Sequence, residues 1–372
     1  MRVLHVIADG APGGGPTMVQ TLCAQMAPWG VEPLIVTQAD SPLHAQGPAA
    51  GLRTVGLDFA SRAAGLRLAG QIARLAAQER IDLIHAHGAR SALPAALMRR
   101  SERPPLVYTV HGFHYRRKPA PLRWLGREAE RFCIRRAEAT TFVSSGDEAS
   151  ARQERLLGAG RAVLIHNGVS VPPGLAVPDA QRRFDLAFVG RLHPQKDPLI
   201  LPDILAAMRP ARPSLLVVGG GPLEGALRER ILARGVEAQV TLLPAMPRAE
   251  ALAWLAQARV CVLPSLWEGL PISLAEAMLL DVCVAASRVE GNIEIVHDGQ
   301  TGRLAPAGEA AGFAKILGEL LAAPEPRAAL AQAGRRFAEE TFSPARQAQA
   351  FADLYARLLA VRAGAQPSER PE

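Results

Sequence analysis

Short runs of apolar, often β-branched residues alternate along the chain with amphipathic stretches of helical length. Each run is almost wholly apolar, which indicates strands buried on both faces of parallel sheets with crossover helices between them. The pattern therefore predicts an α/β protein. The expected strands lie at 3–8, 33–37, 82–86, 106–110, 139–143, 162–166, 185–190, 214–218, 239–243, 259–263 and 282–286.

A segment rich in proline and glycine interrupts this alternation between residues 168 and 178. Because that composition continues neither a strand nor a helix, we place an interdomain linker there. The predicted domains are 1–170 and 171–342. A last helix is expected over 343–361, with Ser343 as its cap and Pro344 in its first turn, and residues 362–372 are expected to form a flexible tail.

Length and composition agree with two globular domains. A chain of 372 residues is too long for one typical core, and a hydrophobic content of 49% is ample for packing. No apolar run approaches the roughly 20 residues that span a bilayer, and the first residues fit a buried strand better than a signal peptide. The four cysteines lack paired spacing, which is typical of reduced thiols, so we expect a cytoplasmic protein.

The formal net charge of +7 is concentrated in one region. Residues 99–136 contain eleven basic and three acidic side chains. Such a patch suits anionic partners, and we expect peripheral contact with the anionic inner face of a membrane. A solvated helix face in an arginine-rich chain explains the charge equally well. No nucleic-acid motif accompanies the patch, so nucleic acid is not an expected partner.

The string Ser-Leu-Trp-Glu-Gly-Leu-Pro-Ile-Ser-Leu-Ala-Glu-Ala-Met at 265–278 is the most informative motif. It follows an apolar strand, and its Gly-Leu-Pro turn places Glu268 on a loop and Glu276 inside the next helix. Two carboxylates at one such corner can hold two parts of a polar ligand, while amides at the helix start can meet an anion. Glutamate is common, so only the whole string is specific.

Two cations follow the first strand of the second half. Arg191 comes directly after Gly190, and Lys196 lies five positions further, across a proline. The arginine offers a planar fork of donors and the lysine a compact charge, a combination suited to a diphosphate. The alternative is a pair of unrelated surface cations.

Two glycine-rich turns and one histidine lie where strands end. Gly14 and Gly15 precede the first helix, and Gly220 follows the strand at 214–218. Glycines let the backbone approach a ligand closely, although purely structural turns remain the alternative. His111 follows the strand at 106–110, where parallel sheets bind ligands, and His114 is a weaker candidate. A lone histidine is more often structural than functional.

The Glu-x7-Glu string resembles the signature of family 4 glycosyltransferases, which are retaining enzymes of the GT-B architecture. The strings at 188–197 and 217–224 are similar to other motifs of that family, and His-Gly-Phe-His-Tyr at 111–115 is similar to its bacterial capsular and exopolysaccharide members. The resemblance implies a GT-B fold, with two Rossmann-like domains whose parallel sheets face each other across a cleft. It also implies that the last helix crosses back to the N-terminal domain.

The resemblance further implies roles for particular residues. The matching histidine, here His111, lies beside the transferred sugar, as does the glutamate at Glu268. The residues matching Arg191 and Lys196 bind the nucleotide diphosphate, and Glu276 accepts hydrogen bonds from the ribose. The remaining donor-binding candidates are Gly14, Gly15, Gly190, Gly220, Met246, Gly269, Leu270 and Ile272. Pro244 departs from the family, which commonly has glycine in that stretch.

The expected reaction is retaining transfer of a hexose-type sugar from a nucleotide diphosphate sugar, a UDP-sugar, to a hydroxyl of a surface-polysaccharide or lipid-linked saccharide. The chain has no Asp-x-Asp pair and no clustered metal-ligand motif, so neither a metal nor a cofactor beyond the donor is expected. Two alternatives stay open. One is a nucleotide-sugar epimerase on a related scaffold, and the other is a non-catalytic nucleotide-sugar-binding partner of a polysaccharide assembly complex.

Overall fold

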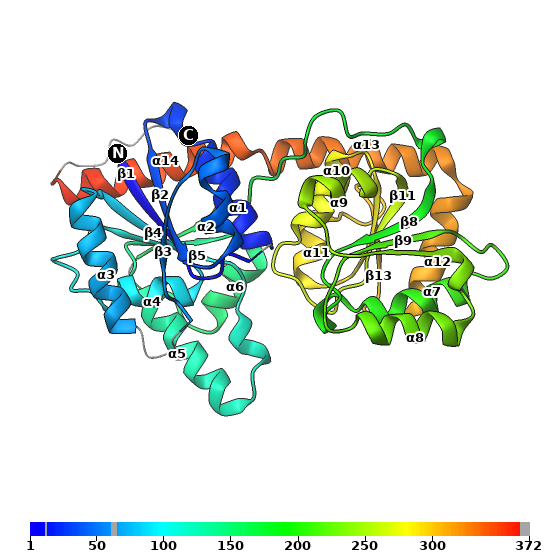
Figure 1. The fold of residues 1–372 in the computed structure, drawn as a ribbon, viewed down its shortest axis with the longest axis horizontal. Coiled ribbons are helices and arrows are strands. Elements are labelled where there is room, and N and C mark those ends of the chain that lie inside the picture. The colour runs from blue at the N-terminus through cyan, green and yellow to red at the C-terminus, as the bar shows by residue number, and fades with distance from the viewer. Residues whose placement is uncertain (12, 61–64, 159, 365–372) are drawn as a thin grey trace. The chain divides into compact units, whose positions relative to one another are not determined.

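The computed structural model describes residues 1–11, 13–60, 65–158 and 160–364, without the side chain of Arg117. It contains two compact units (Figure 1). The first comprises Met1–Gly168 and the helix that begins at Pro344, and the second comprises Val169–Ser343. Residues 365–372 of the expected tail lie outside the described part of the chain.

The first unit is built on a seven-stranded parallel sheet in the order β3-β2-β1-β4-β5-β6-β7. Its strands are β1 Arg2–Ile7, β2 Glu32–Gln38, β3 Arg53–Leu57, β4 Leu83–His87, β5 Leu106–Val110, β6 Ala139–Phe142 and β7 Arg161–Leu164. Its α-helices are α1 Gly14–Ala24, α2 Pro42–Gln46, α3 Gly65–Gln78, α4 Ala89–Leu97, α5 Ala120–Arg136, α6 Ser145–Gln153 and α14 Pro344–Arg362.

The second unit is built on a six-stranded parallel sheet in the order β10-β9-β8-β11-β12-β13. Its strands are β8 Phe184–Val189, β9 Leu215–Val218, β10 Val240–Leu243, β11 Ala258–Leu263, β12 Cys283–Ser287 and β13 Arg303–Ala305. Its α-helices are α7 Leu201–Ala207, α8 Glu224–Arg234, α9 Arg248–Leu255, α10 Ile272–Leu279, α11 Glu290–Ile295, α12 Ala310–Ala322 and α13 Pro324–Thr341.

The α/β class predicted from the alternating pattern is confirmed, and every expected strand is present within one or two residues. Two strands escaped prediction. β3 lies at the edge of its sheet and is only half-buried, so its sequence lacks a continuous apolar run. β13 is also an edge strand and has three residues. Edge strands are exposed along one side, and the criterion of a wholly apolar run misses them.

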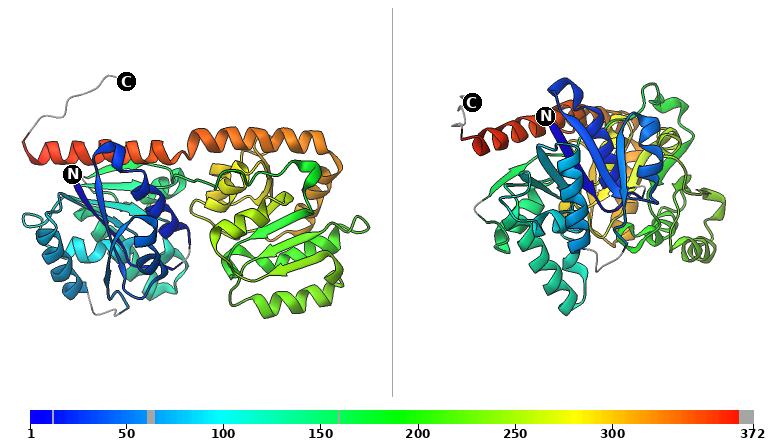
Figure 2. Two further views of the ribbon diagram at one scale, coloured as in Figure 1. Left: turned by 45° about the horizontal axis from the view of Figure 1, so that its top comes forward. Right: turned by 60° about the vertical axis from the view of Figure 1, so that its left-hand side comes forward.

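The two faces of the first sheet differ in chemistry. Alternate residues of β1, such as Leu4 and Val6, face the apolar core formed with α3, α4 and α5. The intervening positions, including His5, face the other side, because successive side chains of a strand point in opposite directions. Helix α14 packs on this side of the sheet (Figure 2). Its Phe351 contacts the ring of His85.

None of the helices in the described residues combines the length and the apolar character that crossing a membrane requires. Both sheets are wholly parallel, so within each unit the carboxyl ends of all strands meet at one edge. Ligands of such sheets bind at that edge.

Candidate active site

In the first unit, the predicted site residues lie at the carboxyl edge of the sheet. Gly14 and Gly15 open α1, directly after the loop that follows β1, and His111 is the first residue after β5. A Cβ atom at Gly15 would make only ordinary contact with Ile7, at 3.7 Å. Steric crowding therefore does not require glycine at position 15.

His111 is not a lone histidine. Its Nε2 lies 3.4 Å from Nδ1 of His87, and Nε2 of His87 lies 3.1 Å from Nδ1 of His5. Burial, followed by the nearby charge of His114, lowers the pKa of His111 to about 4, so its imidazole is neutral at pH 7. His111 is thus the outer end of a row of histidines that leads into the first unit.

Sequence reasoning missed His5, His85 and His87. The available signal was the spacing His85-x-His87 at the end of one predicted strand and His5 in another, which puts all three on one face once β1 pairs with β4. The expected absence of clustered histidines is therefore wrong, since nitrogens of these three side chains lie within 4.8 Å of one another.

The contacts of His85 favour hydrogen bonding over metal coordination. Its Nδ1 lies 2.6 Å from the hydroxyl of Tyr355, and its Nε2 lies 2.6 Å from Oγ1 of Thr109. The His85 and His87 rings lie 4.0 Å apart between centroids, tilted by 39°. A metal ion would need a lone pair on His85 directed at the ion, and both nitrogens already have hydroxyl partners.

In the second unit, the loops after β8 and β9 pack tightly against each other. The amide of Gly190 donates to the carbonyl of Val218 at 3.0 Å. A Cβ at Gly219 would lie 1.9 Å from the carbonyl oxygen of Gly190, so only glycine fits there. A Cβ at Gly220 would instead meet Cβ of Ala245 at 3.4 Å. Close packing of the two loops therefore explains why position 219 requires glycine. Gly220 instead faces the segment that contains the half-buried Met246.

Lys196 and Glu268 form an ion pair that joins the ends of β8 and β11. Nζ of Lys196 lies 2.5 Å from Oε1 of Glu268, and the two side chains are 15% and 6% exposed. The hydroxyl of Ser265 donates to the same oxygen at 2.6 Å, and Nε2 of Gln195 donates to Oε2 at 3.3 Å. The carboxylate is held on both oxygens, which gives the ammonium group a defined position.

Arg191 is exposed, and no ion pair of its guanidinium occurs within the described part of the chain. Lys196 is paired with Glu268, and that Arg191 and Lys196 share one ligand stays a prediction. The loop after β8 therefore carries the exposed guanidinium of Arg191 and the ammonium of Lys196, which is held in place by its ion pair.

Glu276 lies in α10, and its Oε1 accepts a hydrogen bond from Nε of Arg248 at 2.7 Å. Arg248 begins α9 and also donates to the carbonyl oxygen of Ser170 at 2.5 Å. Sequence reasoning missed Arg248, because no spacing rule links it to a glutamate 28 positions away. The pairing fixes the orientation of one predicted donor-binding carboxylate.

The loop from Glu268 to Ile272, which contains Gly269 and Leu270, packs against α11. A Cβ at Gly291 would lie 2.1 Å from the carbonyl oxygen of Gly269, so only glycine allows this approach. Gly291 is a further residue that the motif search did not find. Its importance depends on a contact between α11 and the loop before α10.

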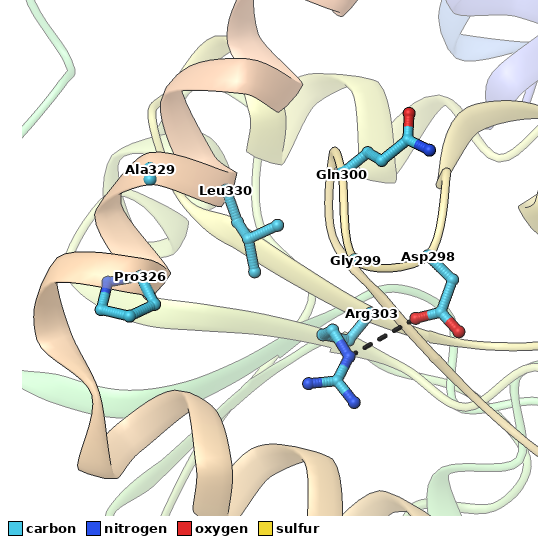
Figure 3. A pocket seen from close by; sticks show the side chains of 7 residues that line it. All are labelled: Asp298, Gly299, Gln300, Arg303, Pro326, Ala329 and Leu330. Atoms are coloured by element: carbon cyan, nitrogen blue, oxygen red, sulfur yellow. Dashed lines mark ion pairs between the residues drawn. The ribbon is translucent and has the colours of Figure 1, made fainter.

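The second unit also has a surface depression of about 560 Å³ beside α13 (Figure 3). An ion pair between Arg303 and Asp298, at 3.4 Å, crosses its floor. The lining residues all come from outside the candidate set: Asp298, Gly299, Gln300, Arg303, Pro326, Ala329 and Leu330. We therefore keep the candidate site at the strand ends.

Comparisons with known proteins identify the family. Residues 13–168 match the model of the glycosyl transferase 4-like domain, and residues 183–323 match that of glycosyl transferases group 1. The putative glycosyltransferase EpsD of Bacillus subtilis is 30% identical over 294 residues, which cover 74% of this chain and 76% of that protein. The chain belongs to the group 1 glycosyltransferases. The predicted family is confirmed.

Other relatives agree with this assignment. The D-inositol 3-phosphate glycosyltransferase of Arthrobacter sp. (strain FB24) is 30% identical over 291 residues, covering 70% of this glycosyltransferase and 67% of that protein. Among solved structures, HepE of Anabaena in complex with UDP and glucose matches with a TM-score of 0.82 at 20% identity, over 96% of this chain and 99% of that one. Sucrose-phosphate synthase of Thermosynechococcus elongatus matches with a TM-score of 0.82 at 21% identity, over 97% and 99%. The two-domain GT-B fold is thereby confirmed.

Proposed function

We propose that this glycosyltransferase moves a hexose-type sugar, with retention, from a nucleotide diphosphate sugar to a saccharide hydroxyl, and that the second unit binds the donor. The observation that carries the proposal is the buried Lys196–Glu268 pair at the carboxyl edge of a parallel sheet. It puts a fixed cation and a fixed carboxylate where ligands of such sheets bind.

We assign a role to each residue near that pair. Lys196 and the exposed fork of Arg191 would bind the diphosphate and stabilise the charge that develops on the leaving group. Glu268 would face the donor sugar. Glu276, oriented by Arg248 at 2.7 Å, would accept hydrogen bonds from the ribose through its remaining lone pairs.

UDP is the nucleotide we propose, because HepE of Anabaena was solved with UDP and glucose and matches over nearly the whole chain. The acceptor we propose is a surface-polysaccharide or lipid-linked saccharide intermediate.

We propose that transfer needs no divalent metal. Lys196 and Arg191 supply positive charge beside the proposed diphosphate site, the task that a metal performs in other transferases. Activity should persist in EDTA. Loss of transfer in EDTA that added Mn²⁺ or Mg²⁺ restores would contradict this.

The basic region 99–136 carries fewer free charges than its sequence indicates. The side chain of Arg103 is fully buried and pairs with Glu138 at 2.8 Å. Arg116 and Arg127 share Glu154 at 2.8 Å and 3.3 Å. These arginines are paired with carboxylates of the first unit, which leaves fewer unpaired charges for docking.

Helix α5 nevertheless offers an amphipathic surface for an anionic membrane. Leu122, Trp124 and Leu125 are 53%, 64% and 58% exposed, and the exposed cations Lys118 and Arg123 lie beside them in the sequence. Exposed tryptophan and leucine with basic neighbours suit the interface of an anionic bilayer. We propose that this surface holds the enzyme on the inner membrane face.

Vesicle sedimentation tests this docking, with phosphatidylglycerol mixed into phosphatidylcholine. Replacing Leu122, Trp124 and Leu125 by serine should release the protein from the vesicles. The matched control is Leu232→Ser, which removes a 63% exposed leucine from α8 of the second unit. Equal binding by the triple variant and the wild type would refute the docking surface.

A thermal-shift panel of nucleotide diphosphates and nucleotide sugars, with and without EDTA, tests the donor site. A ligand at about 100 times its dissociation constant adds roughly 2.7 kcal/mol to the free energy of unfolding. We expect a shift with one base that disappears in Glu276→Ala and persists in Glu229→Ala, which removes an exposed glutamate of the same unit. No shift with any nucleotide would count against donor binding at this corner.

Product analysis then separates transfer from its rivals. An epimerase would release free sugar without an acceptor, and a non-catalytic partner would bind the nucleotide without turnover. Glycosylated acceptor is the outcome that the proposal requires.

A further inference from the structure

A row of polar side chains crosses one face of the first sheet. In the parallel register His5 of β1 lies beside His85 of β4, and His87 lies beside Thr109 of β5. His5 and His85 are fully buried and His87 is 4% exposed. The row ends at His111, where β5 reaches the carboxyl edge of the sheet.

Burial keeps these histidines neutral. It lowers the pKa of His5 to about 3, of His111 to about 4, and of His85 and His87 well below the usual value. A neutral imidazole carries one N–H and one bare nitrogen. Each contact between two rings therefore needs one donor and one acceptor, so the tautomers of His5, His87 and His111 depend on one another.

Only two tautomer patterns satisfy both hydrogen bonds of the row. In the first, Nδ1 of His5 donates to His87, and Nδ1 of His87 donates to Nε2 of His111. The proton of His111 then lies on Nδ1, and the inner Nε2 of His5 is a bare nitrogen. In the second, every donor is reversed, so Nδ1 of His111 is bare and Nε2 of His5 carries a proton.

The inner end of the row decides between the patterns. Nε2 of His5 is buried, and no hydrogen-bond partner for it occurs among the residues that the structure describes. Orphaned N–H donors are rarer in protein interiors than under-satisfied acceptors, so an unpaired acceptor is the better tolerated of the two. The first pattern, with a bare Nε2 on His5, is therefore the more stable one.

We propose that His87 is a positioning residue, which donates from Nδ1 to Nε2 of His111 and so holds the proton of His111 on Nδ1. This rests on the proposed function, in which His111 lies beside the transferred sugar. With its proton on Nδ1, His111 donates a hydrogen bond to a sugar oxygen through the nitrogen that faces away from His87. In this form Nε2 of His111 already accepts the hydrogen bond from His87, so His111 is not the base that removes the acceptor proton.

Nitrogen-15 NMR of histidine-labelled full-length protein tests the tautomers without any ligand. Signals of His111 are assigned by their loss in His111→Gln, among the nine histidines of the chain. We expect the wild type to carry the His111 proton on Nδ1 alone. His87→Phe, which keeps a ring but removes both nitrogens, should give a mixture of the two tautomers.

His5→Phe is the matched control, because it alters the same buried row and leaves the His87–His111 contact in place. It should leave the tautomer of His111 unchanged, since a bare Nε2 on His87 then ends the row. The proposal is overturned by a proton on Nε2 of His111 in the wild type. It is equally overturned if His87→Phe has no effect, or if His5→Phe scrambles the tautomer as much as His87→Phe does.

Kinetics give a second readout. Loss of an oriented hydrogen-bond donor should lower kcat/KM for the donor sugar about threefold to tenfold in His87→Phe, and much less in His5→Phe. Because NMR needs no substrate, the two proposals fail separately. The expected tautomer in a protein that transfers no sugar would refute the proposed function alone, and the opposite result would refute the positioning role alone.

Discussion

Replacing Lys196 by alanine tests the proposed donor site most directly, because the change should affect both stability and rate. Removing one partner of a buried ion pair costs about 3–5 kcal/mol when the other charge is left uncompensated. Here Ser265 and Gln195 still donate to Glu268, at 2.6 Å and 3.3 Å, so we expect the lower limit of about 3 kcal/mol. In a unit of this size that lowers Tm by roughly 6–12 °C.

The effect on rate should exceed the effect on binding. If Lys196 stabilises charge on the departing diphosphate, its loss should lower kcat about 10²- to 10³-fold. The assay is release of nucleoside diphosphate in the presence of acceptor, measured well below both melting temperatures. Lys315→Ala is the matched control, since Lys315 is an exposed lysine of the same unit.

A double variant separates the two effects. Adding Glu268→Gln to Lys196→Ala removes the uncompensated charge, so it should recover most of the lost Tm without recovering the rate. If the double variant regains the rate, the loss in Lys196→Ala was structural. If Lys196→Ala alone transfers sugar within a few-fold of the wild type, the leaving-group role of Lys196 is wrong.

Three further outcomes follow from the packing and the buried titratable groups. Gly291→Ala would put a Cβ atom 2.1 Å from the backbone oxygen of Gly269, so the loop before α10 must move. Both Tm and the nucleotide-induced thermal shift should fall. Gly318→Ala, at a helical position with open space, is the control. Burial lowers the folded-state pKa of His5 to about 3. The stability that its neutral form contributes is therefore lost as pH falls below 6.5, by up to about 1.4 kcal/mol per pH unit. Urea unfolding should show a weaker acid dependence in His5→Phe. Burial raises the folded-state pKa of Glu130 from 4.5 to about 7, so its contribution to stability is lost as pH rises through that window; Glu130→Gln should flatten the urea midpoint between pH 5 and 8, and an unchanged slope would contradict the assignment.

Local patterns were sufficient for the elements that bury both faces. The strands β8 and β11 could be placed from sequence because an almost wholly apolar run of that length has few alternatives between helices. The corner that holds Glu268 and Glu276 was equally accessible, since its turn and helix start lie within one short string. The edge strand β3 was not, because one of its five residues is exposed and the other four are only half-buried, so no continuous apolar run marks it.

Contacts between distant segments could not be predicted in this way. The partner of Lys196 lies 72 positions away, and the hydroxyl that binds His85 lies 270 positions away on α14. The basic region 99–136 shows the same limit, because its composition did not reveal that Arg103 is buried against Glu138. A count of charged residues describes a segment, whereas the number of charges that are free to bind a partner depends on what packs against that segment.

The sequence by itself determined the α/β class, the family and the segments that carry polar residues to strand ends, because periodicity and motif strings are properties of neighbouring residues. Tertiary structure alone decided which of those residues meet. The order β1-β4-β5 aligns His5, His87 and His111 on one face, although a sequence of isolated histidines predicts no contact between them. Strand order and register are set by the packing of the whole sheet, and that packing determines which nitrogen of a buried histidine can hold its proton.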